Sequence, residues 1–141
     1  MENLIGSAEI TVKKENLAAA VGSGDTEVLA TPSVAAVMEK AASQSIVPLL
    51  APDETTVGTF LSISHIAPTP EGLKAFAFSK LISISENQRE FTFLVEAYDE
   101  TGLISKGEHK RVKVKKEKFV HKAKNKLFSD ARNSAPVPFN S

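Results

Sequence analysis

The sequence predicts a single α+β domain in which a curled antiparallel sheet wraps around one main helix. Two observations predict it: residues 31–45 carry one apolar stripe at helical spacing, and residues 55–114 hold four segments of alternating polarity separated by short turn-forming stretches. One early helix followed by consecutive strands buries its apolar side against one face of their sheet. At 141 residues the chain is long enough to bury such a core without disulfides.

The helix is expected to begin at Thr31, as the N-cap, with Pro32 in the first turn. Its apolar stripe comprises Val34, Val37, Met38, Ala41 and the less apolar Ser45. Glu39 lies away from this stripe on the helical wheel, beside Ala35, Ala36 and Ala42. A solvated glutamate is the simpler interpretation of this position. The alternative is a carboxylate whose small neighbours let a ligand or a second backbone approach the helix.

Four long strands are expected over residues 55–67, 73–85, 90–99 and 103–114, joined by short turns into an antiparallel meander. Shorter extended pieces are predicted at 9–12 and 27–30, with a mobile loop between them. One helix covering one face of such a curled sheet is a hotdog arrangement. From Lys116 a basic helical stretch is expected to reach Phe128, so that residues 1–128 form one domain and residues 129–141 a flexible tail.

Three positions on the predicted strands are candidates for chemistry, and each also has a structural interpretation. His65 is expected on the inward face of its strand, which also carries Val57, Thr59, Leu61 and Ile63. It is either a packed core histidine or an acid–base group. An acid–base histidine needs a carboxylate partner, for which Glu39 is the candidate. Gly58 marks a β-bulge, or a backbone against which a ligand carbonyl lies. Arg111 alternates with His109 on the last strand, either as a solvated edge or as a phosphate-binding rim.

Composition excludes several classes of protein. The chain has no cysteine, which fits a reducing cytoplasm, and no apolar run long enough to cross a membrane, so we expect a soluble cytoplasmic protein. Its three histidines lack metal-ligand spacing, and neither a phosphate-binding glycine loop nor a nucleophile elbow is present, so we expect no metal and no cofactor.

The zero net charge conceals a split between two parts of the chain. Residues 1–105 carry six basic and fourteen acidic side chains, whereas residues 106–126 carry ten basic and two acidic ones. This basic run can attract an anion that the sequence does not identify. Nucleic acid is not the expected partner, since Phe119 is the one stacking aromatic in the run.

Several motifs together resemble the hotdog-fold thioesterases similar to the fluoroacetyl-CoA-specific thioesterase, over roughly residues 8–120. They are the Thr31-to-Glu39 spacing of eight, the VGT segment with Gly58 seven residues before His65, the H-x-A-x-T-P-x-G run from His65 to Gly72, and the G-x-H-x-R run ending at Arg111. The resemblance implies an acyl-CoA thioesterase, with CoA entering as part of the substrate. It also implies a homodimer with sites at the subunit interface.

The same resemblance implies roles for five residues. Thr31, Glu39 and His65 correspond to the catalytic trio, Gly58 to a backbone that contacts the acyl group, and Arg111 to a polar residue bordering the site. Glu39 is expected to attack the thioester or to activate water, with Thr31 orienting its carboxylate. Residues 15–28 lack the lid phenylalanine of fluoroacetyl-specific members, so a short or medium acyl-CoA is the expected substrate. A non-catalytic acyl-CoA binding or sensing protein is the alternative.

Overall fold

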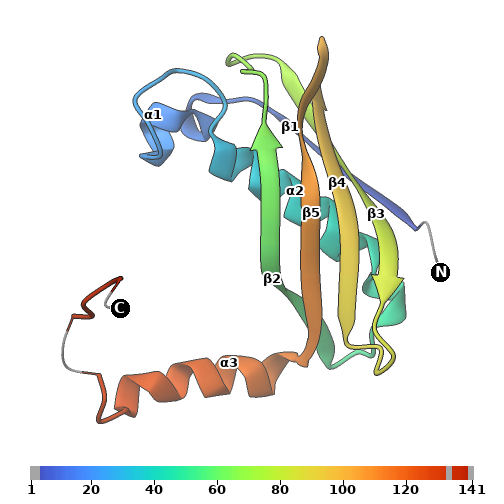
Figure 1. Ribbon diagram of the computed structural model, residues 1–141, viewed down its shortest axis with the longest axis vertical. Coiled ribbons are helices and arrows are strands. Elements are labelled where there is room, and N and C mark those ends of the chain that lie inside the picture. Colours follow the sequence, from blue (N-terminus) through green and yellow to red (C-terminus); the bar gives the residue numbers. More distant parts are fainter. Residues whose placement is uncertain (1–3, 133–134, 140–141) are drawn as a thin grey trace.

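The computed structural model describes residues 4–132 and 135–139, and its main feature is one long helix packed on a five-stranded antiparallel sheet (Figure 1). The helix is α2 (Thr31–Ser45). The strands are β1 (Ile5–Thr11), β2 (Glu54–His65), β3 (Lys74–Ile84), β4 (Glu90–Asp99) and β5 (Gly102–Lys115). The predicted hotdog arrangement of a curled sheet around one main helix is therefore confirmed.

The order of the strands differs from the predicted meander. Across the sheet the order is β1-β3-β4-β5-β2, so only β3, β4 and β5 are joined as consecutive hairpins. β2 pairs with β5, and the sequence 66–73 crosses from one side of the sheet to the other. The meander prediction was wrong for β2 because alternation of side chains defines a strand but not its neighbour. As a result β2 is an outer strand, and β5, which carries His109 and Arg111, lies inside the sheet.

The start of α2 also differs in one functionally important detail. The N-cap is Ala30, so Thr31 is the first helical residue and Pro32 the second, and no side chain caps the helix. Pro32 still suits this position because an N–H in the first turn has no partner within the helix. Thr31 was wrongly predicted as the cap, and its hydroxyl group bonds elsewhere.

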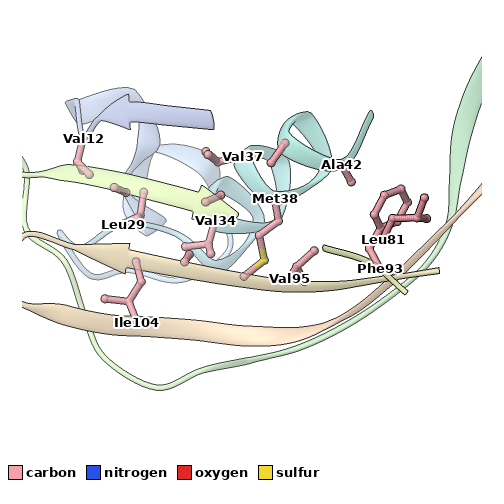
Figure 2. Packing of buried hydrophobic residues seen from close by; sticks show 14 of the residues in the cluster. Val12, Leu29, Val34, Val37, Met38, Ala42, Leu81, Phe93, Val95 and Ile104 are labelled. Atoms are coloured by element: carbon pink, nitrogen blue, oxygen red, sulfur yellow. The ribbon is translucent and has the colours of Figure 1, made fainter. Parts of the chain in front are cut away.

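The core lies between α2 and the inner face of the sheet. Met38 points from the middle of α2 toward the sheet, with Val95 of β4 beside it (Figure 2). The predicted stripe is buried at Val34, Val37, Met38 and Ala41, and the helix buries Ala42 as well, which sequence analysis had grouped with Glu39. Ser45 is half-buried. The buried face is wider than the predicted stripe because the curled sheet contacts more than one side of the helix.

A β-bulge interrupts β2 between Gly58 and Phe60, as expected for the glycine. The bulge inserts one residue and changes which side chains face inward. Thr56 is buried before the bulge, and Leu61, Ile63 and His65 are half-buried after it. The prediction that Val57 and Thr59 share the face of His65 was therefore wrong, because strict alternation does not continue through a bulge.

The segments at either end of the domain complete the description. The predicted loop after β1 contains the short helices η1 (Lys14–Asn16) and α1 (Ala18–Val21), and isolated bridges join Leu17 to Leu29 and Val28 to Pro70. η2 (Val47–Leu49) follows α2. The predicted basic helix is observed as α3 (Lys116–Lys124) and η3 (Asn125–Phe128), with α3 leading away from the sheet past β2 (Figure 1).

The predicted flexible tail at 129–141 falls partly outside the described residues, at 133–134 and 140–141, and stays a prediction. Among the helices of the described residues, none has the length and apolar character to span a membrane.

Candidate functional site

The first group of candidate residues joins the start of α2 to the end of β2. Thr31 Oγ1 and His65 Nδ1 are hydrogen-bonded at 2.7 Å. Burial lowers the pKa of His65 from its ordinary value, and the backbone of Ala67 partly opposes that shift. Nε2 of the same ring is buried and has no hydrogen-bond partner among the described residues. A neutral imidazole with one ring nitrogen held by Thr31 can accept or deliver a proton near neutral pH.

The backbone around β2 determines where this pair lies. The Leu29 amide donates to the carbonyl of Thr69 at 2.8 Å, which ties the residues before α2 to the loop that follows His65. Thr69 is fully buried and donates through its hydroxyl to Asp99 at 2.8 Å. The H-x-A-x-T-P-x-G run thus has a structural role as well. Its Thr69 links the loop after His65 to the residues before Thr31, which keeps the two side chains near each other.

The second group lies farther along α2 and faces the bulge in β2. Glu39 Oε2 is 3.7 Å from Nη1 of Arg111, and 44% of the Glu39 side chain is exposed against 10% for Arg111. A Cβ atom built on Gly58 would lie 2.7 Å from the same carboxylate oxygen, closer than real side chains approach. The carboxylate therefore sits against bare backbone, and any larger residue at position 58 would displace it from this position. The sharper interpretation of Glu39, a carboxylate facing a closely approaching backbone, matches this geometry.

Arg111 is a buried and fully engaged guanidinium, contrary to the solvated edge considered above. Its Nε donates to the Thr56 hydroxyl at 2.9 Å, Nη2 donates to the Thr56 carbonyl at 3.0 Å, and Nη1 approaches Nε2 of His109 at 3.1 Å. Burial lowers the pKa of Arg111, and the charge of Glu39 opposes that shift. The planar fork of arginine is needed here, because one side chain directs donors at three acceptors.

His109 is a member of this group that sequence analysis did not assign to the site. It is 1% exposed, and its Nδ1 lies 2.8 Å from the carbonyl of Phe60, the residue that ends the bulge. Arginine cannot accept a hydrogen bond, so Nε2 of His109 accepts from Arg111 and Nδ1–H donates to Phe60. Burial lowers the pKa of His109, the backbone of Phe60 opposes that shift, and the charge of Arg111 lowers it further. The ring is held neutral in one tautomer.

The two groups are separate within one chain. Thr31 bonds His65, whereas Glu39 pairs with Arg111, and no hydrogen bond or ion pair between described residues links Glu39 to Thr31 or His65. Within one chain Thr31 therefore does not orient the Glu39 carboxylate, and the expectation that it does so in the complete site stays a prediction. Eight residues of α-helix place the two about 12 Å apart along the axis. The one sequence signal for His109 was its alternation with Arg111 in the G-x-H-x-R run.

Comparisons with known proteins agree with this fold and show the family to which the chain is similar. The model of a family described as fluoroacetyl-CoA-specific thioesterase matches residues 12–117. A fluoroacetyl-CoA thioesterase from Streptantibioticus cattleyicolor is 34% identical over 100 residues, which cover 71% of this chain and 70% of that protein.

Solved structures show the same relation. A structure of the fluoroacetyl-CoA thioesterase is 26% identical with a TM-score of 0.82, covering 89% of this chain and 96% of that one. A hypothetical Thermus thermophilus protein described as a thioesterase superfamily member is also 26% identical, with a TM-score of 0.80, covering 91% of this chain and 93% of that one.

Proposed function

Because this chain belongs to the fluoroacetyl-CoA-specific thioesterase family, we propose that it is a thioester hydrolase that cleaves a short or medium acyl-CoA into free acid and CoA. The observation that carries the proposal is the partly exposed Glu39 carboxylate in contact with the bare backbone at Gly58. The reaction needs a carboxylate within reach of the thioester carbonyl, and the bulge at Gly58 brings bare backbone up to a carboxylate that is partly exposed. CoA enters as part of the substrate, and the proposal uses no metal or other cofactor.

In this mechanism the thioester carbonyl lies against Gly58. The backbone of Gly58 contacts the acyl group at the bulge, where the regular pairing of β2 with β5 is interrupted. Glu39 either attacks the carbonyl carbon, so that the C–S bond breaks and an acyl–glutamyl anhydride forms, or removes a proton from the attacking water. In both routes the departing thiolate takes up a proton, and one water is consumed to give the free acid and to restore the Glu39 carboxylate. Arg111 holds the carboxylate toward the bulge.

His65 and Thr31 supply the proton-transfer part of the proposal. His65 has a lowered pKa and a buried, unbonded Nε2 among the described residues, so it can carry a proton to or from the reaction. Thr31 fixes the orientation of the ring through Nδ1. The catalytic trio is thus Thr31, Glu39 and His65, with Gly58 and Arg111 bordering the substrate.

We also propose that the working form is a homodimer with its sites at the subunit interface. β2 is an outer strand of twelve residues, and an unpaired strand edge can pair with a second copy. Antiparallel pairing of two β2 edges places the Glu54 end of one beside the His65 end of the other. Each Glu39 then lies between two Thr31–His65 pairs, which suits a site whose groups are apart in one chain. Light scattering on the purified protein measures the mass.

Two further features of the proposal concern substrate and compartment. The lack of phenylalanine in residues 15–28 favours acyl groups other than fluoroacetyl, up to medium length. We place the protein in the cytoplasm, where acyl-CoA is available and where a chain without cysteine has no need of an oxidising environment.

The test is free-thiol release from a panel of acyl-CoAs, from acetyl to long-chain, with wild type and Glu39→Gln side by side. Glu39→Gln keeps the shape of the side chain and removes its charge, and we expect kcat to fall by about 10²- to 10⁴-fold or more. Equal rates in the two proteins would remove Glu39 from the mechanism. Binding of acyl-CoA without turnover by wild type would favour the alternative, a binding or sensing protein. In heavy-oxygen water a single turnover labels Glu39 only if the anhydride forms and water attacks its glutamyl carbonyl, whereas label in the free acid alone agrees with either route.

A further inference from the structure

A basic recess lies beyond the candidate site, between the end of β5, the β3–β4 hairpin and α3. Its volume is about 530 Å³. Five basic side chains and one carboxylate, Glu54, line it, and the basic ones are Arg89, Lys113, Lys115, Lys118 and Lys122. The recess thus contains four of the ten basic side chains of the run 106–126, whose anion the sequence left unidentified.

Not all of this positive charge is neutralised within the protein. Lys115 pairs with Asp53 at 3.1 Å and with Glu54 at 3.8 Å, and Lys113 lies 4.0 Å from Glu54. In residues 4–132 and 135–139, by contrast, no ion pair is formed by Arg89, Lys118 or Lys122. Three cations therefore remain available to an anion that enters the recess.

The recess also offers an aromatic surface. Phe119 lines it and is 42% exposed, and it lies between Lys118 and Lys122 in the sequence of α3. Lys118 and Lys122 are four residues apart and so share one side of the helix. The exposed apolar residue Val120 falls on the other side of the helical wheel. A planar ring beside two free ammonium groups suits a heteroaromatic base that carries phosphate.

The distance from the candidate site fits one particular ligand. Lys113 and Lys115 follow Arg111 at alternate positions on the same face of β5, as their contacts with Thr56 and Glu54 on β2 show. At about 3.4 Å per residue, Lys115 lies about 14 Å from Arg111 along the strand. The pantetheine arm of CoA, comparable to about four extended residues, reaches about 14 Å.

We propose that this recess binds the 3′-phospho-ADP end of the CoA thioester whose acyl group lies at Glu39. Arg89, Lys118 and Lys122 pair with the phosphates, and the adenine ring stacks on Phe119. This inference rests on the proposed function, because it assigns the second half of the same substrate. It also explains why the basic residues are concentrated at one end of β5 and on α3.

The experiment compares one acyl group on two carriers, CoA and pantetheine, the second of which lacks the nucleotide. For Lys118→Ala/Lys122→Ala we expect the ratio of kcat/KM for acyl-CoA to that for acyl-pantetheine to fall about tenfold or more. The matched control is Lys116→Ala/Lys124→Ala, which removes the same charge from the same helix outside the recess and should keep the wild-type ratio. Added salt should raise the KM of wild type for acyl-CoA and leave that for acyl-pantetheine unchanged.

Failure of this inference is distinguishable from failure of the proposed function. If wild type hydrolyses both carriers equally well, or if the two double variants have the same ratio, the nucleotide site is refuted while the thioesterase stands. If neither thioester is hydrolysed, calorimetric titration with 3′-phospho-ADP still tests the recess. Binding that the Lys118→Ala/Lys122→Ala variant loses supports it, and no binding by wild type overturns it. If the KM for the same acyl group is lower on an acidic carrier protein than on CoA, the proposal is overturned and the recess is assigned to the carrier protein instead of the nucleotide.

Discussion

Replacing Gly58 by alanine tests the feature on which the proposed chemistry depends, the contact between the Glu39 carboxylate and bare backbone. The added Cβ would lie 2.7 Å from Glu39 Oε2, 3.2 Å from Cε1 of His109 and 3.4 Å from Nη1 of Arg111. Carbon and oxygen atoms need roughly 3.3 to 3.5 Å, so the carboxylate must withdraw by about 0.6 to 0.8 Å. Of the two buried neighbours, His109 needs to move by only a few tenths of an ångström, and the contact with Arg111 is an ordinary one.

The consequence should appear in activity more than in stability. The Glu39 side chain is 44% exposed and ends in a flexible carboxylate, so its withdrawal should cost less than about 1 kcal/mol of unfolding free energy. A misplacement approaching 1 Å at a catalytic group can cost about 10²-fold in rate. We therefore expect kcat/KM to fall by about 30- to 100-fold, which corresponds to about 2 to 2.7 kcal/mol of transition-state stabilisation.

The assay is steady-state thiol release with the best acyl-CoA from the panel, together with thermal unfolding of each variant. Gly24→Ala is the control, because its Cβ would make an ordinary 3.6 Å contact with Ala18 and the site is not involved. A kcat/KM for Gly58→Ala within about twofold of wild type would refute the argument that the carboxylate acts from this position. A large fall in the melting temperature of Gly58→Ala, together with a large fall in kcat/KM, would mean that the substitution had disturbed the bulge itself and not only the carboxylate.

Two other predictions concern the hydrogen bonds of the site, and a third concerns its two histidines. Thr31→Val removes the bond to His65 without removing a helix cap, so kcat should fall about tenfold with little change in unfolding free energy, and an unchanged pH–rate profile would argue against orientation of the ring. Arg111→Lys leaves Thr56 and His109 without donors, so urea unfolding should show a loss of about 2 to 4 kcal/mol, and an unchanged midpoint would contradict the described role of the guanidinium. Burial lowers the pKa of both His65 and His109 below 6.5, so on acidification the unfolded chain takes up protons at a higher pH than the folded protein does. The contribution of these histidines to the free energy of unfolding is fully present above pH 6.5 and should be lost as the pH falls through the folded pKa values. Thermal unfolding from about pH 7.5 to about pH 5 measures this loss, His109→Gln should reduce it, and a melting temperature that rises on acidification would exclude it.

Much of the architecture followed from local patterns in the sequence. Helical spacing placed α2 and its buried Val34 and Met38, and alternation placed the four long strands to within a few residues. The glycine in a β-branched run marked the bulge at Gly58. These features depend on periodicity and backbone preference, which neighbouring residues determine among themselves.

The composition of the candidate site was predictable only in part. Glu39, Gly58 and Arg111 were named from motif spacing, and the structure brings them together. His109 was passed over because a histidine on a strand rich in lysine resembles a solvated edge, and only the sheet order shows that β5 is an inner strand.

The sequence by itself determined the elements of this protein, their faces and the residue types available for chemistry. Only the tertiary structure decided that β2 pairs with β5, that Thr31 bonds His65 rather than Glu39, and that Arg111 is buried. The physical reason is that a strand's side-chain pattern is the same whichever neighbour it pairs with, so partners distant in sequence are chosen by the packing of the whole sheet on α2. Hydrogen bonds between such partners therefore appear only when the fold is complete.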